Sequence, residues 1–111
     1  MHYTLNAVGD IQTEAPRHGG LSDFGRELVR KAQAKGMLVD LAHSTEAAVG
    51  HALAVASKPM VWSHGWVRER VGQWQESYGY QKRALSLEHA RRIAAADGVV
   101  GGIYRFTHPR R

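Results

Sequence analysis

The chain has 111 residues, of which 43% are hydrophobic and 23% are charged, a composition typical of one small globular domain. It contains no cysteine, which excludes disulfides and thiolate metal sites, so any metal ligand must be His, Asp or Glu. The 15 Lys and Arg against 10 Asp and Glu give a net charge of +5, but these basic residues are scattered and match no nucleic-acid-binding motif. We therefore expect a solvated surface and no nucleic-acid partner.

The sequence has no apolar run close to the roughly 20 residues that a membrane-spanning helix needs. The residues after Met1 have neither the charged start nor the apolar centre of a signal peptide. We expect a soluble chain without a membrane segment, cytoplasmic by default, and the sequence does not identify the compartment.

Two long segments lack hydrophobic periodicity, residues 1–21 and residues 65–85. The first contains Gly9-Asp10 and Gly19-Gly20, and the second interleaves aromatic residues with glycines and charges. Long irregular segments in a compact domain are often active-site loops. We predict that both are long loops at the rim of the fold, and that residues 107–111 form a basic tail.

Between these segments the pattern predicts a helix that begins after Ser22, a favourable N-cap, with Asp23 in the first turn. Gly36 supplies its C-terminal stop. The residues expected on its buried face are Phe24, Leu28, Val29 and Ala32.

A strand over residues 37–43 follows, and its nearly continuous apolar run favours a parallel strand that is covered on both faces. Ser44 is expected to cap a helix over residues 45–57. The buried side of that helix is predicted to be Ala48, Val49, Ala52, Leu53 and Ala56. Pro59 is tolerable at the start of a strand, so residues 60–64 are predicted to be the next strand.

The last predicted elements are a helix after Ser86 that ends at Asp97-Gly98 and a strand over residues 99–104. The residues expected on the buried side of this helix are Leu87, Ala90, Ile93 and Ala94. Strands that alternate with helices indicate βαβ units and a parallel sheet. Because the crossovers are right-handed, the carboxyl ends of all three strands should share one edge.

Two of these predicted strands end on a histidine, His43 and His64. If the strands are neighbours, about 4.8 Å apart, the two imidazoles can converge on one metal ion. The alternative is that each histidine caps a backbone group or lies in a satisfied core position. Because side chains alternate between the two faces of a strand, Asp40 is expected to face away from His43. It is predicted to be a hydrogen-bonded structural support. No role is predicted for the remaining histidines of the predicted loops and helices, His18, His51, His89 and His108.

A catalytic metal site normally has three protein ligands and an open position, so the residues alone indicate only part of a site. The chain also carries a series of short motifs in a fixed order. They are His2-Tyr3, Asn6, Gly9-Asp10-Ile11-Gln12-Thr13-Glu14, His18-Gly19-Gly20-Leu21, Asp23-Phe24-Gly25, the segments 36–43, 58–59 and 63–64, Arg83 before Leu85, and Gly98-Val99-Val100-Gly101. In this order and spacing they resemble the membrane (renal) dipeptidase family of zinc peptidases, in particular its bacterial branch, from His2 to about Tyr104.

The resemblance implies a (β/α)8 barrel of the metal-dependent hydrolase type, with two zinc ions and a bridging hydroxide that attacks a dipeptide amide. His43 and His64 match the two strand-end histidines that bind one zinc. His2 matches a catalytic histidine, and Arg83 matches the arginine that holds the substrate carboxylate. Arg83 is followed by Ala84 where many members have asparagine, so the resemblance does not define the preferred dipeptide or related small amide.

Other metal ligands of the family have no counterpart in this chain: an amino-terminal His-x-Asp pair, a bridging glutamate and a later acidic residue. At most one zinc is therefore expected here. A complete barrel takes about 250 residues and eight strands, whereas this chain supplies three clear strands. The fold expected for residues 1–111 is a single incomplete segment of a (β/α)8 TIM barrel, an α/β structure.

We therefore predict a segment of a zinc-dependent dipeptidase that is inactive in isolation. Its open sheet edges should favour self-association or pairing with a complementary barrel segment. Two other hypotheses stay open: a non-enzymatic α/β remnant or metal-binding assembly module, and a basic domain that binds anions or nucleic acid.

Overall fold

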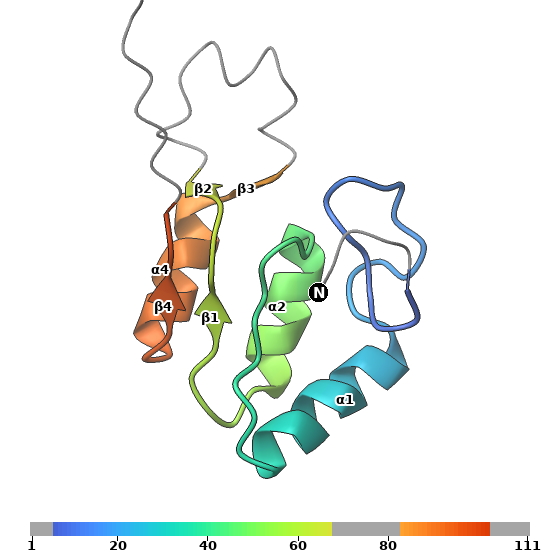
Figure 1. Cartoon of the computed structure of the whole chain (residues 1–111). Coiled ribbons are helices and arrows are strands. Elements are labelled where there is room, and N and C mark those ends of the chain that lie inside the picture. The colour runs from blue at the N-terminus through green and yellow to red at the C-terminus, as the bar shows by residue number, and fades with distance from the viewer. Residues whose placement is uncertain (1–5, 68–82, 103–111) are drawn as a thin grey trace, which may run out of the picture.

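The computed structural model of the chain describes residues 6–67 and 83–102, which contain helices and short parallel strands (Figure 1). The helices are α1 (Asp23–Ala34), α2 (Glu46–Val55) and α4 (Leu87–Ala95), and the strands are β1 (Val61–Trp62), β2 (Trp66–Val67), β3 (Ala84–Leu85) and β4 (Val99–Val100). Helix α2 packs between α1 and α4, and α4 packs against β4. The predicted α/β class with parallel strands is confirmed.

The strands form two small parallel sheets. β1 pairs with β4, with Val61 opposite Val99, and β2 pairs with β3, with Trp66 opposite Ala84. Both β2 and β3 lie at the ends of the segment 65–85, where the sequence pattern indicated no strand.

Segment 39–41 extends the first sheet on the other side of β1. A parallel bridge joins Asp40 to Val61. Leu41 N donates to Val61 O at 2.7 Å, and Val61 N donates to Val39 O at 3.0 Å. The segments predicted as strands at 37–43 and 99–104 therefore both pair with the segment 60–64 and run in the same direction, and within the described residues the regular pairing is shorter than predicted. Residues 103–104 of the last predicted strand, residues 68–82 of the second predicted loop and the predicted tail 107–111 lie outside the described residues.

The start of the first of these segments does not lie in the core. Met37 and Leu38 are 61% and 67% exposed, so the prediction that this strand is covered on both faces is wrong at its first two residues. Pairing of this segment with β1 begins at Val39, whose carbonyl accepts from Val61 N, whereas Met37 N donates to Ala32 O of α1 at 2.9 Å.

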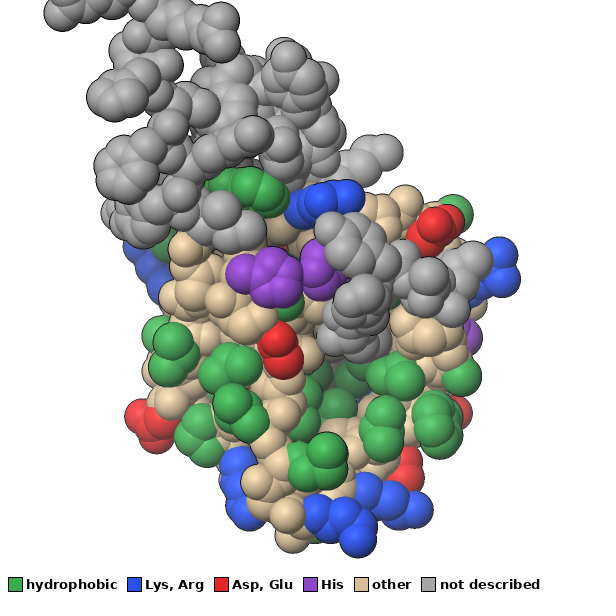
Figure 2. Space-filling model, viewed as in Figure 1, with side chains coloured by type: hydrophobic (Ala, Val, Ile, Leu, Met, Phe, Trp, Pro, Cys, Tyr) green, Lys and Arg blue, Asp and Glu red, His purple; other side chains and the backbone are tan. Residues whose placement is uncertain are grey.

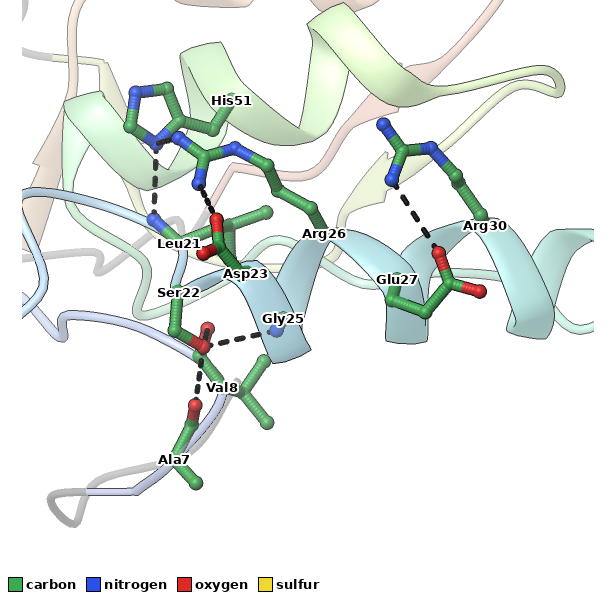
Figure 3. Close-up of polar contacts among 10 residues, drawn as sticks. All are labelled: Ala7, Val8, Leu21, Ser22, Asp23, Gly25, Arg26, Glu27, Arg30 and His51. Carbon is green, nitrogen blue, oxygen red and sulfur yellow. Dashed lines mark hydrogen bonds and ion pairs between the residues drawn. The ribbon is translucent and has the colours of Figure 1, made fainter.

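The start of α1 is tied both to the preceding loop and to α2 (Figure 3). Ser22 is the N-cap, as predicted, and its Oγ accepts from Gly25 N at 3.0 Å. From α2, His51 Nδ1 accepts from Leu21 N at 3.2 Å and faces the Arg26 guanidinium at 3.0 Å. Because arginine can only donate, this ring nitrogen of His51 is an acceptor. The histidine therefore links the two helices.

The buried face of α1 differs from the predicted one. Val29 is buried and Ala32 is half-buried, but Phe24 and Leu28 are 60% and 40% exposed. The other residues of the helix that are buried are Gly25 and Gln33. Helix α1 therefore turns a different face toward the core from the one that its hydrophobic residues predicted.

The side chain of Gln33 explains this rotation. Its Oε1 accepts from Ser57 N at 2.7 Å, and its Nε2 donates to Lys58 O at 2.8 Å. A buried amide is stable only when its polar atoms are paired, and here both are satisfied by the backbone that follows α2. Gln33 therefore anchors the C-terminal half of α1 in place of an apolar residue.

Helix α2 buries Ala48, Val49 and Ala52 as predicted, while Leu53 and Ala56 pack against the core from partly buried positions. Its N-cap is Thr45, not Ser44: Thr45 Oγ1 accepts from Ala48 N at 3.2 Å. Ser44 is instead buried in the preceding turn, where its N–H donates to Leu41 O at 3.1 Å.

Helix α4 begins after Ser86, as predicted, and buries Ile93 against the sheet. Ala94 is exposed, which contradicts its predicted place in the core, and Leu87 and Ala90 are half-buried. The core cluster consists of Leu21, Val29, Leu41, Ala48, Val49, Ala52, Met60, Trp62, Leu85 and Ile93. None of the helices in the described part of the chain is long and apolar enough to cross a membrane.

Candidate metal centre

His43 and His64, which lie 21 positions apart in the sequence, are in direct contact at one edge of the strands. Their Nε2 atoms are 2.9 Å apart, and the two rings meet edge to face with centroids 4.8 Å apart. Histidine side chains gather on this face next to a basic side chain (Figure 2). The sequence-based prediction that these two histidines converge therefore agrees with the geometry.

The backbone explains how His43 reaches this position. After Leu41 the chain leaves the strand in a turn closed by Ser44 N and Leu41 O at 3.1 Å. Within the turn His43 has φ 70°, a left-handed conformation that is uncommon outside glycine. The turn carries the His43 side chain across to the end of the neighbouring strand, where His64 lies.

Asp40 supports this edge, as predicted, although it is exposed rather than buried. Its Oδ1 accepts from Ala42 N at 3.0 Å and from Ser63 N at 3.1 Å. Partial burial opposes ionisation, but hydrogen bonds from the side chain of Ser63 and from these two backbone groups outweigh it and lower the pKa of Asp40 below 3.8. At neutral pH the group is a carboxylate that only accepts hydrogen bonds.

The donor set and spacing of the histidine pair suit a zinc ion. Two nitrogens bound tetrahedrally to zinc at about 2.0–2.1 Å lie roughly 3.3 Å apart. The two Nε2 atoms, now 2.9 Å apart in a hydrogen bond, would have to separate by only about 0.4 Å. In the hydrogen bond one nitrogen carries a proton and the other accepts it. Because a metal is coordinated through the lone pairs of both nitrogens, that proton must leave before a metal binds.

A third ligand does not join the pair within the part of the chain that the structure describes. In residues 6–67 and 83–102, three or more His, Cys, Asp or Glu side chains nowhere gather closely enough to hold a metal. His2, the predicted catalytic histidine, lies outside the described residues.

Arg83, the predicted substrate-binding residue, immediately precedes β3 and is half-buried. β3 pairs in parallel with β2, which starts two residues after His64, with Trp66 opposite Ala84. The backbone register thus brings the start of β3 beside the segment that follows His64. Gln12 contributes a further link, because its Nε2 donates to Ala84 O at 3.4 Å.

Asp10 closes the first loop, a role that the sequence pattern did not predict. Its buried carboxylate accepts from Arg17 N at 2.7 Å, from His18 N at 2.9 Å and from Gly20 N at 2.8 Å. Burial raises the pKa of Asp10, but these backbone hydrogen bonds and the nearby His18 outweigh it, so the pKa lies below 3.8. No local sequence signal indicates such a loop, because the bonded residues follow Asp10 by seven positions or more, beyond the two-residue reach of an aspartate turn.

The loop that Asp10 closes is bonded to the turn that carries His43. Gln12 N donates to His43 O at 3.0 Å, and Thr45 N donates to Asp10 O at 3.2 Å. Ile11 forms an antiparallel bridge with Ser44 and is 1% exposed. The segment before α1, although irregular in sequence, therefore supports the histidine turn.

The chain matches the family model described as membrane dipeptidase (peptidase family M19) over residues 3–101. It therefore belongs to the membrane dipeptidase family, a family of metal-dependent (zinc) dipeptidases, and the resemblance stated from the sequence is confirmed. A dipeptidase of Claviceps purpurea, tcpJ, is 46% identical over 57 residues, which are 51% of this chain and 13% of that protein.

Two solved structures from Pseudomonas aeruginosa share the fold. The probable dipeptidase PvdM superposes with a TM-score of 0.79 at 24% identity, over 92% of this chain and 25% of that protein. An amidohydrolase superposes with a TM-score of 0.72 at 30% identity, over 89% of this chain and 27% of that protein. The 111 residues thus correspond to about a quarter of each of these two solved proteins.

Proposed function

We propose that this chain is a segment of a zinc-dependent dipeptidase in which His43 and His64 bind one zinc ion. The observation that carries the proposal is the 2.9 Å contact between their Nε2 atoms at the ends of two neighbouring strands. It is supported by membership of a dipeptidase family over residues 3–101. When bound, zinc supplies Lewis acidity that polarises an amide carbonyl and acidifies water.

The proposed substrate is a dipeptide or a related small amide, which follows from the family. We assign Arg83 to the substrate carboxylate, because a guanidinium group can donate two parallel hydrogen bonds to a carboxylate. The backbone pairing of β2 with β3 supports this assignment. We assign His2 to the stabilisation of the reacting amide on the resemblance alone.

The isolated chain is expected to bind at most one zinc ion and to have no dipeptidase activity. Two histidines leave a catalytic zinc one ligand short of the usual three. The residues that complete the proposed site would come from further (β/α) units, because the chain spans only about a quarter of the solved relatives. We accordingly propose that the fold is part of a (β/α)8 barrel.

An uncovered apolar groove favours pairing with such units. It has a volume of about 540 Å³ and lies between α1 and segment 37–41, lined by side chains that include Leu28, Val29, Met37 and Val39. In a barrel this surface would be covered by a neighbouring strand and helix, and in the isolated chain self-association would cover it. Sedimentation should then show dimers or larger species that Leu28→Glu shifts toward monomer, and a monomeric wild type would contradict this.

The test of the metal site is calorimetric titration of the purified chain with zinc chloride. We expect micromolar or tighter binding of one ion, lost in both His43→Ala and His64→Ala. His89→Ala is the matched control, because this histidine of α4 contacts the N-cap residue Ser86 rather than His43 or His64. Unchanged zinc binding in both variants would refute the assignment. Zinc-dependent dipeptide hydrolysis by the isolated chain, abolished by His43→Ala, would refute the expected inactivity.

The second candidate function is a non-enzymatic α/β module. The observation that favours it is the limited donor set, two histidines without a third metal ligand in the described residues. This hypothesis predicts no zinc binding by the wild-type chain at micromolar concentrations, and the same titration therefore separates the two candidates.

A further inference from the structure

We propose that Gln12 is a positioning residue that fixes the backbone at Arg83 relative to the histidine pair, and so sets the length of substrate that the site accepts. Gln12 acts through Ala84, the residue after Arg83, and through the turn that carries His43. The inference rests on the proposed function, because it concerns the metal-binding and carboxylate-binding ends of the same site.

The first half of this role is the attachment of Gln12 to the histidine turn. Gln12 N donates to His43 O at 3.0 Å, and the preceding residue, Ile11, forms an antiparallel bridge with Ser44. Ile11 and Ser44 are each 1% exposed, so water does not compete for this pairing. These bonds use backbone atoms only, which leaves the side chain of Gln12 for a second contact.

The second half is the contact of the Gln12 side chain with strand β3. Gln12 Nε2 donates to Ala84 O at 3.4 Å, a long hydrogen bond between residues 72 positions apart. Because a carbonyl oxygen only accepts, the amide nitrogen of Gln12 and not its amide oxygen must face Ala84. Ala84 and Leu85 are each 1% exposed, so the strand that receives this bond is itself fixed in the buried interior.

Strand β3 is thereby held from both members of the histidine pair. From the side of His64, β2 starts two residues later and pairs in parallel with β3, beginning at Ala84. From the side of His43, Gln12 reaches the same residue, Ala84. The two histidines are joined to each other through their Nε2 atoms at 2.9 Å. The backbone at Arg83 is therefore placed relative to both histidines by contacts that meet at the next residue.

This arrangement makes Gln12 a determinant of substrate length. In the proposed site the reacting amide lies at the histidine pair and the terminal carboxylate lies at Arg83. The number of bonds between these two groups fixes their separation in a substrate, so a rigid spacing in the protein selects one length. Loss of the link through Gln12 should therefore reduce the selectivity for length and leave the binding of zinc by the two histidines in place.

The first test reads the link in the metal-free 111-residue chain by nuclear magnetic resonance. In wild type we expect a nuclear Overhauser effect between the side-chain amide protons of Gln12 and the Ala84-Leu85 segment. Gln12→Glu places a carboxylate, which cannot donate, against Ala84 O and should shift the backbone amide resonance of Leu85. Thr13→Glu is the matched control, because it adds the same charge at the next, exposed position and should leave Leu85 unchanged.

The second test measures selectivity for length in the zinc-loaded chain, with the straight-chain acids mercaptoacetate, mercaptopropionate and mercaptobutyrate as probes. Each offers a thiolate to zinc and a carboxylate to Arg83, and they differ only in the number of methylene groups between the two. Wild type should bind one of them about 10-fold more tightly in calorimetry, because the others lose hydrogen bonds to the carboxylate. In Gln12→Ala and Gln12→Glu the affinities should differ by less than about 3-fold. Thr13→Glu should retain the wild-type preference.

The outcomes separate this inference from the proposed function. Absence of the Overhauser effect in wild type, or an unchanged Leu85 resonance in Gln12→Glu, overturns the link whether or not zinc binds. A wild type without a preferred length, or Gln12 variants that keep the preference, overturns the role in selectivity. Zinc affinity that falls in Gln12→Ala as much as in His43→Ala would show that Gln12 supports the whole edge and would overturn the assigned role. The expected resonances in a chain that binds no zinc support the link and overturn the metal site, and with it the role in selectivity.

Discussion

Asp10 and Asp40 use their carboxylates in the same way in two different regions of the molecule. Each accepts hydrogen bonds from more than one backbone N–H group, and in each the pKa is lowered because hydrogen bonds outweigh the effect of burial. Asp10 is 3% exposed and closes a loop, whereas Asp40 lies at the exposed edge and joins two strands. Similar carboxylate hydrogen bonds therefore stabilise a loop in the buried region around Asp10, whereas around Asp40 they fix the relative position of two strands at an exposed edge.

The largest expected effect comes from removal of the buried carboxylate. Asp10→Ala leaves three N–H donors without their acceptor and should lower the free energy of unfolding by about 3 kcal/mol. Asp10→Asn keeps one oxygen acceptor and should cost less. Urea unfolding followed by circular dichroism measures both, and an equal, small loss in the two variants would show that the loop does not depend on this side chain.

The next effect is a dependence of stability on pH. The pKa of folded Asp10 lies below its ordinary value of 3.8, so its ionisation stabilises the fold above that value. This contribution is lost as the pH falls through the folded pKa. Urea midpoints measured from pH 6 to pH 2 should therefore fall more steeply for wild type than for Asp10→Asn, and parallel curves would contradict the assignment.

The loop around Asp10 also shows where prediction from sequence succeeded and where it failed. Glycines and the lack of periodicity correctly indicated irregular backbone, but hydrogen bonds between Asp10 and residues 17–20 are invisible to periodicity. The same limit applies to α1, where Phe24 and Leu28 were expected in the core. Hydrophobicity could not show that Gln33 would be paired by the backbone after α2 and so take the buried position.

The histidine pair was predictable for a physical reason. Parallel strands that end on the same type of residue place those residues at one edge, and this held for His43 and His64 even though only residues 39–41 of the first strand pair with β1. The hydrogen bonds of Asp40 were anticipated only as general support. Its exposure and its bond to Ser63 depend on the turn after Leu41, which the sequence did not reveal.

A smaller effect on stability is expected at the exposed edge. Asp40→Ala removes an acceptor shared by Ala42 N and Ser63 N. Ser63 is exposed and its N–H can bind water, whereas Ala42 is buried, so one N–H group loses its acceptor and the free energy of unfolding should fall by about 1 kcal/mol. The ratio of the loss in Asp40→Ala to the loss in Asp10→Ala measures how the contribution of a carboxylate to stability differs between the exposed edge and the buried loop. A loss at Asp40 as large as that at Asp10 would mean that the edge is shielded from water.

The smallest effect is expected where a carboxylate pairs with side chains on the outside of a helix. Glu27 lies 3.5 Å from Arg30 and 3.8 Å from Lys31, and its side chain is 52% exposed (Figure 3 shows the Arg30 contact). Glu27→Gln keeps the helix-forming side chain and removes the charge, so the free energy of unfolding should change by less than about 0.5 kcal/mol and be insensitive to added salt. A larger loss of unfolding free energy that becomes smaller in 1 M sodium chloride would contradict this. It would show that carboxylates stabilise this fold through ion pairs rather than through buried hydrogen bonds to the backbone.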